Sequence, residues 1–135
     1  MQLHRGRLLD HVHLRVRDLE RSSKFYVPVF AALGIDVVAD ETHLMADELW
    51  IDLGSPLSHV HLAFQAADRA MVDRFHAAAV LAGGLDNGAP AERAKYHPGY
   101  YAAFVYDPDG NNIEAVYHGA HRRSATSVRI EFERP

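Results

Sequence analysis

The strongest constraint in this sequence is a phrase that occurs twice. The segment DHVHLRVRDLERSSKFY begins at Asp10, and SHVHLAFQAADRAMVDRFH begins at Ser58. An offset of 50 residues aligns His11 with His61, Asp18 with Asp68, Phe25 with Phe75 and Gly34 with Gly84. A duplicated unit fixes the architecture of a chain, and 135 residues are about the length of one domain. We therefore expect a single domain, residues 1–135, made of two similar modules.

Each copy begins with the alternation of a half-buried strand. In HVHLRV and HVHLAF, apolar side chains occupy one face and histidines occupy the other. The polar face carries His11 and His13 in the first copy, and His59 and His61 in the second. The two modules are thus expected to present histidines from equivalent strands.

A helix is expected after each of these strands. Asp18 and Asp68 are suited to cap the first turn, because an aspartate side chain accepts hydrogen bonds from the free backbone N–H groups there. Apolar residues follow at helical spacing, and the patterns end at Gly34 and near Gly83. Pro28 lies inside the first pattern and is expected to kink the helix or to start a new segment.

The rest of the chain has the patterns of further strands. IDVVADE and ELWIDLG follow the first helix, where room for only about two strands predicts an abbreviated first module. YYAAFVY and NNIEAVYH follow the second helix and are joined by the turn sequence DPDG. Because the helices must cover the apolar side of the strands, we expect an α+β fold whose polar face lines a concavity. The tail, 120–135, contains SVRIEFE, which has the alternation of an extra edge strand.

The final strand supplies a carboxylate to the polar face. Alternation allows Glu114 to share the face of His11 and His61. Two neutral imidazoles and one carboxylate make an open site for a divalent metal ion such as Zn, Ni, Mn or Fe. His13 and His59 lie on the same faces, and a register shift of two residues exchanges them with these candidate ligands.

The chain resembles the vicinal oxygen chelate superfamily in LDHVHLRVRDLERSSKFY, in HVHLAF and in DPDGNNIEAV. This superfamily includes glyoxalase I, extradiol dioxygenases, fosfomycin-resistance enzymes and bleomycin-resistance proteins. The resemblance implies paired βαβββ modules, at about 8–56 and 58–119, that form an incomplete barrel around a metal ion. It also implies that the ligands are His11, His61 and Glu114, and that the chain pairs as a homodimer.

Members similar to glyoxalase I use a fourth ligand, a Glu of the first module. Aligning Asp47 with Asp109 places Asp52 opposite Glu114, so Asp52 is the candidate for this position, with a shorter side chain than Glu. Trp50 shares the face of Asp52 and is expected to wall the pocket.

A second cluster of candidates precedes the strand YYAAFVY. The run KYHPGYY contains His97 and Tyr100, which we expect to orient a substrate or to move a proton, as does Glu114. These three residues are the candidate catalytic groups.

Composition limits the partners of the chain. A formal net charge of −4 without a basic stripe is not typical of proteins that bind nucleic acid or anionic membranes. The sequence has no apolar run long enough for a membrane span and no pattern of a secretory signal. It has no cysteine, which suits the cytoplasm.

Three functions remain open on these grounds. The first is a metal-dependent enzyme that chelates two oxygens of a small substrate and performs isomerase or lyase chemistry of the glyoxalase type. The second is an extradiol-type Fe(II) dioxygenase, against which the length argues, since such enzymes commonly have four modules. The third is a metal-free binding protein similar to the bleomycin-resistance proteins, against which the candidate ligands argue.

Overall fold

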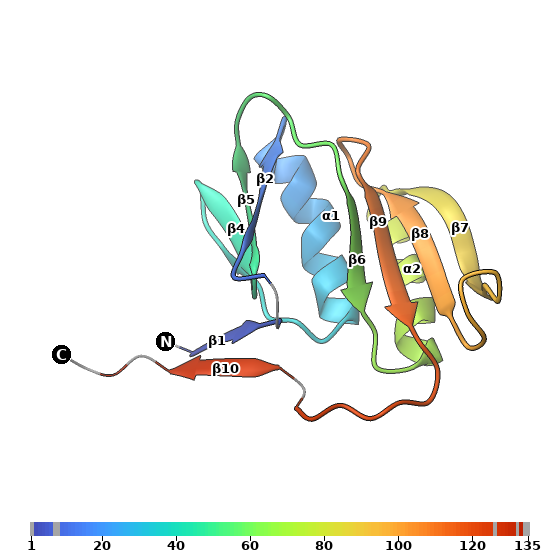
Figure 1. Cartoon of the computed structure of the whole chain (residues 1–135). Helices are drawn as coiled ribbons and strands as arrows, with labels where there is room; N and C mark the ends of the chain where they lie inside the picture. Colours follow the sequence, from blue (N-terminus) through green and yellow to red (C-terminus); the bar gives the residue numbers. More distant parts are fainter. Residues whose placement is uncertain (1, 7–8, 126, 132, 134–135) are drawn as a thin grey trace.

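Two sheets of equal size, each with its own helix, form most of the chain. The computed structural model describes residues 2–6, 9–125, 127–131 and 133. Figure 1 shows the two sheets side by side, with β2, β5 and β4 in one and β6, β9, β8 and β7 in the other. The arrangement is the paired-module α+β fold that the repeat predicts.

The first module has the order strand, helix, three strands. Its elements are β2 (Val12–Val16), α1 (Leu19–Ala32), β3 (Val38–Ala39), β4 (His43–Ala46) and β5 (Leu49–Leu53). In the sheet the order is β2-β5-β4-β3, and β2 pairs with β5 in parallel while the other pairs are antiparallel.

The second module repeats this topology. Its elements are β6 (His61–Gln65), α2 (Arg69–Leu81), β7 (Leu85–Glu92), β8 (Tyr101–Tyr106) and β9 (Asn112–Tyr117). The sheet order is β6-β9-β8-β7, and β6 again pairs in parallel with the last strand of its module. In both modules, therefore, the first strand lies beside the last.

Both helices begin at the expected caps. The Asp18 side chain accepts a hydrogen bond from the Arg21 backbone N–H at 3.1 Å, and Asp68 accepts one from Met71 at 2.8 Å. Gly34 and Gly83 follow the helix ends with φ of 71° and 96°, a region that glycine occupies without steric cost. The predicted helices and their offset of 50 residues are confirmed.

Pro28 does not start a new segment, so that alternative was wrong. The helix α1 continues through it from Leu19 to Ala32. Phe25, Tyr26, Val29 and Phe30 lie on both sides of the proline and are all buried in one core. Their shared burial keeps the two halves of the pattern in a single helix.

The strand count of the first module was also wrong by one. The module is short, as expected, but three strands fit because β4 and β5 are joined by the two-residue turn Asp47–Glu48, and β3 has only two residues. Asp47 adopts a φ of 48° in this turn. In the second module the strand β7 was missed, since it contains Gly88 and Pro90 and pairs irregularly with β8.

The two ends of the described chain form a separate ribbon. Strand β1 (Gln2–Arg5) pairs in antiparallel fashion with β10 (Val128–Glu131), which confirms a strand in the tail. Figure 1 shows this ribbon below the first module, with the tail crossing from the end of β9 to reach it. The described part of the chain contains no helix long and apolar enough to cross a membrane.

The core lies between the helices and the sheets. Helix α1 contacts β4 and β5, helix α2 contacts β7, β8 and β9, and the helices contact each other. The largest buried side chains come from both helices and both sheets, and they include Tyr26, Phe30, Phe75, Leu14 and Ile113. With the helices on one side, the opposite side of each sheet is left for function.

A buried hydrogen bond ties the turn DPDG to the first helix. The Tyr26 hydroxyl donates to Asp107 Oδ2 at 2.5 Å, and Asn111 Nδ2 donates to the same oxygen at 2.9 Å. Burial, together with the charge of Asp107, raises the pKa of Tyr26 well above its usual value. The phenol therefore stays protonated and holds the turn that leads into β9.

Tyr26→Phe is expected to lower the free energy of unfolding by about 1–2 kcal/mol, because it removes a buried hydrogen bond to a carboxylate. Urea denaturation at neutral pH measures this change. Tyr106→Phe is the control, since Tyr106 is exposed and its hydroxyl has no hydrogen bond among the described residues; it should change stability by less than about 0.5 kcal/mol. Equal effects of the two substitutions would contradict this assignment.

Candidate active site

The predicted site residues on the strands lie on the side of each sheet that the helices leave open. Along β2, Leu14 and Val16 are buried under the helices, whereas His13 and Arg15 are exposed. This is the alternation that the sequence predicts. The open faces of both modules carry histidine and carboxylate side chains.

Glu114 is the centre of the second module's open face. Its side chain is only 2% exposed, and one oxygen accepts a hydrogen bond from His61 Nε2 at 2.8 Å. The contact follows from the register, since Ala63 lies opposite Glu114 and His61 stands two residues before it on the same face. The predicted association of His61 with Glu114 is therefore present in the structure.

Tyr100 binds the second oxygen of the same carboxylate. Its hydroxyl donates a short hydrogen bond to Glu114 Oε2. Burial, followed by the hydrogen bond to Glu114, raises the pKa of Tyr100 above its usual value. A protonated phenol and an imidazole thus hold the two oxygens of one buried carboxylate.

The first module carries a similar pair on its open face. His13 Nε2 lies 2.6 Å from Asp52 Oδ1, and the Trp50 indole N–H donates to Asp52 Oδ2 at 3.2 Å. The hydrogen bond from His13 is the main cause that holds the pKa of Asp52 below its usual value. Arg15 lies opposite Asp52, and His13 stands two residues before Arg15 on the same face. His61 has the same relation to Ala63, the residue opposite Glu114.

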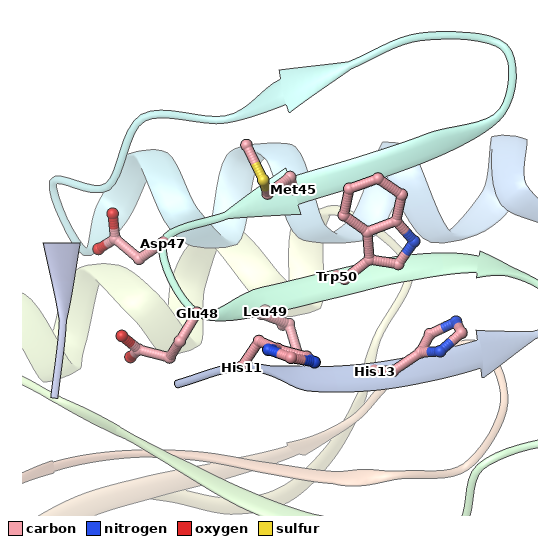
Figure 2. Close-up of a pocket in the computed structure, with 7 residues that line it drawn as sticks. All are labelled: His11, His13, Met45, Asp47, Glu48, Leu49 and Trp50. Atoms are coloured by element: carbon pink, nitrogen blue, oxygen red, sulfur yellow. The ribbon is translucent and has the colours of Figure 1, made fainter. Parts of the chain in front are cut away.

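A cavity opens beside this pair. Its volume is about 440 Å³, and Figure 2 shows it between β2, β5 and the turn that precedes β5, lined by His11, His13, Met45, Asp47, Glu48, Leu49 and Trp50. Trp50 stacks on His43, with ring centroids 4.0 Å apart and planes at 6°. Trp50 therefore lines the pocket, where the sequence analysis expected it.

His11 lies apart from both carboxylates of the candidate set. Its Nδ1 is 2.6 Å from Asp10 Oδ1, and its side chain is 67% exposed. It lines the same cavity as His13, but the structure pairs Asp52 with His13. The 50-residue offset of the repeat makes His11 the counterpart of His61. The contact with a carboxylate instead makes His13 the counterpart of His61.

The single chain does not bring the four candidate ligands together. Among the residues that the structure describes, no group of three or more His, Cys, Asp or Glu side chains lies close enough to hold one metal ion. His61 with Glu114 and His13 with Asp52 are two separate pairs. Each module thus presents two donors of the types that divalent metals bind.

The loop that contains His97 lies next to Tyr100. His97 makes no contact with Glu114; its Nδ1 is 2.9 Å from the Pro98 carbonyl oxygen and its Nε2 is 2.8 Å from His118 Nδ1. Sequence reasoning missed His118 as a site residue, although the alternation of the last strand places it on the face of Glu114. The sequence spacing of His97 and His118 does not predict their contact, because only the folded chain brings the loop and the end of β9 together.

A sequence model of the Glyoxalase/Bleomycin resistance protein/Dioxygenase superfamily matches residues 8–115. A glyoxalase/bleomycin resistance protein from Albidiferax ferrireducens T118 has a similar structure, with 32% identity, a TM-score of 0.72, and coverage of 82% of this chain and 98% of that one. No curated protein gives a significant match.

Two more distant structures share the fold. A glyoxalase-related enzyme from Fulvimarina pelagi is 21% identical, with a TM-score of 0.63 and coverage of 88% of this chain and 99% of that one. A lactoylglutathione lyase from Agrobacterium tumefaciens is 19% identical, with a TM-score of 0.59 and coverage of 83% and 93%.

His13→Ala is expected to raise the pKa of Asp52 toward that of an unperturbed aspartate, because it removes the main hydrogen bond to the carboxylate. Carboxyl-carbon NMR titration, with a chelator present, measures the shift. The stability that this lowered pKa supplies is present above about pH 4 and is lost as the pH falls through the folded pKa. His11→Ala is the control and should leave Asp52 unchanged; a shift of similar size there would contradict the pairing.

Proposed function

Because the chain belongs to the Glyoxalase/Bleomycin resistance protein/Dioxygenase superfamily, we propose that it is a divalent-metal-dependent enzyme acting on a small substrate with two vicinal oxygens. One observation carries this proposal. Each module places a histidine against a carboxylate on its open face, His61 with Glu114 at 2.8 Å and His13 with Asp52 at 2.6 Å. Paired donors of this kind on two equivalent strands are what a shared metal centre requires.

The donor set fits a divalent ion such as Zn, Ni, Mn or Fe. Imidazole nitrogens and carboxylate oxygens are the ligands that these metals share. The second module supplies His61 and Glu114, and the first supplies Asp52 with one of the two histidines that line its cavity, His11 or His13. When bound, the ion acts as a Lewis acid that polarises a substrate oxygen and stabilises the negative charge that develops there.

We propose that a homodimer completes the site. Each open face offers two donors, so a four-ligand centre needs the face of a first module and the face of a second module together. A symmetric pair of chains can bring the first module of one protomer against the second module of its partner, and symmetry then generates two equivalent sites.

The chain's own residues handle the proton. Glu114 is buried between His61 and Tyr100, so its carboxylate is positioned to take a proton from a carbon next to a substrate oxygen and to return it. Tyr100 stabilises the carboxylate by donating to it and stays protonated, because its pKa is raised. This is the proton movement of isomerase or lyase chemistry of the glyoxalase type.

A metal-free binding role is the second candidate function. It is favoured by the wall of the first cavity, where Trp50 stacks on His43 and where Met45 and Leu49 add apolar surface. Such a wall suits the flat face of an aromatic ligand.

Elemental analysis of the purified protein tests the metal. We expect close to one Zn, Ni, Mn or Fe per chain, and at least about tenfold weaker retention in Glu114→Gln, which keeps the side-chain shape but removes the charge of a ligand. Glu41→Gln changes an exposed glutamate outside both open faces and should retain the wild-type metal content. A protein that takes up no metal even after reloading contradicts the proposal and leaves the binding role.

Single alanine variants assign the ligand of the first module. Removing the histidine that coordinates should lower metal affinity more than removing the other, because the other only orients a neighbour or lines the cavity. Loss of an orienting partner by itself costs about 10–100-fold. His11→Ala and His13→Ala are compared by competition with a chelator. If both variants keep the wild-type metal affinity, neither histidine is a ligand. Separately, iron as the native metal would direct the assays toward dioxygenase chemistry.

A further inference from the structure

We propose that His118 and His97 form a latch that positions Tyr100 on Glu114, and that this latch opens when both rings are protonated. His118 is thereby a positioning residue that acts through His97 and Tyr100. The expected effect of the latch on turnover rests on the proposed function, but the latch itself does not.

The two rings are joined edge to edge by a hydrogen bond, and their planes are nearly parallel. His97 Nε2 lies 2.8 Å from His118 Nδ1, and the ring centroids are 5.1 Å apart with planes at 20°. His97 belongs to the loop between β7 and β8, and His118 directly follows β9. The contact therefore joins the loop to the end of the strand that carries Glu114.

Hydrogen-bond chemistry determines which nitrogen carries each proton. The Pro98 carbonyl oxygen can only accept, so His97 Nδ1, 2.9 Å away, carries a hydrogen. In a neutral ring the other nitrogen, Nε2, is then an acceptor. His118 Nδ1 must donate to it, which fixes the tautomers of both rings.

The latch tolerates one added proton and not two. His118 exposes its ring to solvent, and a proton added to its Nε2 leaves the Nδ1–H donor to His97 in place. A second proton must then occupy His97 Nε2, which is the only ring nitrogen of the pair still without one. Two N–H groups then face each other between two cationic rings, so the contact is lost.

Both rings hold the ring of Tyr100. Tyr100 meets His97 edge to face with centroids 5.3 Å apart, and it meets His118 in the same way at 5.2 Å. Tyr96 packs on a further side at 4.9 Å. With its ring enclosed in this way, the hydroxyl of Tyr100 points at Glu114, to which it donates.

The backbone on both sides of the latch is built for close approach. Gly99, two residues after His97, has a φ of 87°, and Gly119, directly after His118, has a φ of 89°. A side chain at Gly99 would contact the Gly119 backbone at 3.4 Å. The loop and the end of β9 therefore meet at two glycines, each in a backbone conformation that glycine adopts without steric cost.

Several titratable groups surround the pair in the described part of the chain. On the loop, the Tyr100 phenol faces the pair, Tyr96 packs against Tyr100, and Lys95 lies over the Tyr96 ring at 5.2 Å. Arg93 is directed away, over Phe104. From β9 the nearest carboxylate is Glu114, reached through Tyr100, and His121 stands beyond on Tyr117.

Nitrogen-15 NMR of the imidazoles tests the latch in the full chain with a chelator present. At pH 8 we expect His97 to carry its proton on Nδ1 and His118 on Nδ1, and hydrogen exchange should show protection of the Tyr100 amide, which donates to the His97 carbonyl. Toward pH 5, after correction for intrinsic rates, that protection should fall at least about threefold as the latch opens. Independent titration of the two rings, with no change in loop exchange, overturns the proposal.

Two substitutions separate the hydrogen bond that His118 donates from the protonation of its ring. His118→Asn keeps an N–H donor near the place of Nδ1, so it should keep the loop protected at pH 8. The same amide can turn its oxygen toward a protonated His97 Nε2, so the substitution should also abolish the loss at pH 5. His118→Ala removes the donor and should lower protection at both pH values. His121→Asn is the matched control, because His121 also follows β9, and it should behave as wild type. If His118→Ala leaves loop protection unchanged, the latch is refuted.

Turnover gives the second readout once a substrate is known. His118→Ala should lower kcat at least about tenfold with little change in KM, His118→Asn should restore most of it, and the acid side of the pH profile should differ between wild type and His118→Asn. If the NMR and exchange results hold while kcat is the same in all variants, the link to catalysis is wrong and the latch stands. If the protein binds no metal and has no activity, only the proposed function fails.

Discussion

Parallel pairing of the first and last strands of each module is the constraint on which the site depends. These strands are distant in the sequence, and only this pairing places His61 beside Glu114 and His13 beside Asp52. The crossover helix that parallel pairing requires also covers one side of the sheet. Functional side chains are therefore confined to the other side, where both pairs are found.

The side chain of Glu114 shows how the fold accommodates a buried carboxyl group. A carboxylate that is 2% exposed is costly to bury without partners, and here His61 and Tyr100 bind its two oxygens. Its environment depends in turn on the loop that carries Tyr100 and on the turn DPDG, which Tyr26 anchors to the first helix. Chemistry on the open face and packing under the helices are thus connected through one strand, β9.

Much of this architecture was predictable because it follows local rules. The repeat, the capping aspartates and the alternation of the strands predicted both helices, the α+β fold and the face on which Glu114 lies. The errors arose where long-range packing overrides local preference, as at Pro28 within α1 and in β7, which accommodates Gly88 and Pro90. The contact of Asp52 with His13 depends on cross-strand register, and the meeting of His97 with His118 depends on a loop, and neither is encoded by spacing.

We propose that each chain contributes half of two shared metal sites. The most direct test is the metal content of a heterodimer purified with two different tags, one chain carrying Asp52→Ala and the other Glu114→Ala. Each variant alone should lose its metal. If sites are shared between protomers, one site of the heterodimer is intact and about half of the wild-type metal returns. A heterodimer that stays as empty as the single variants would contradict shared sites.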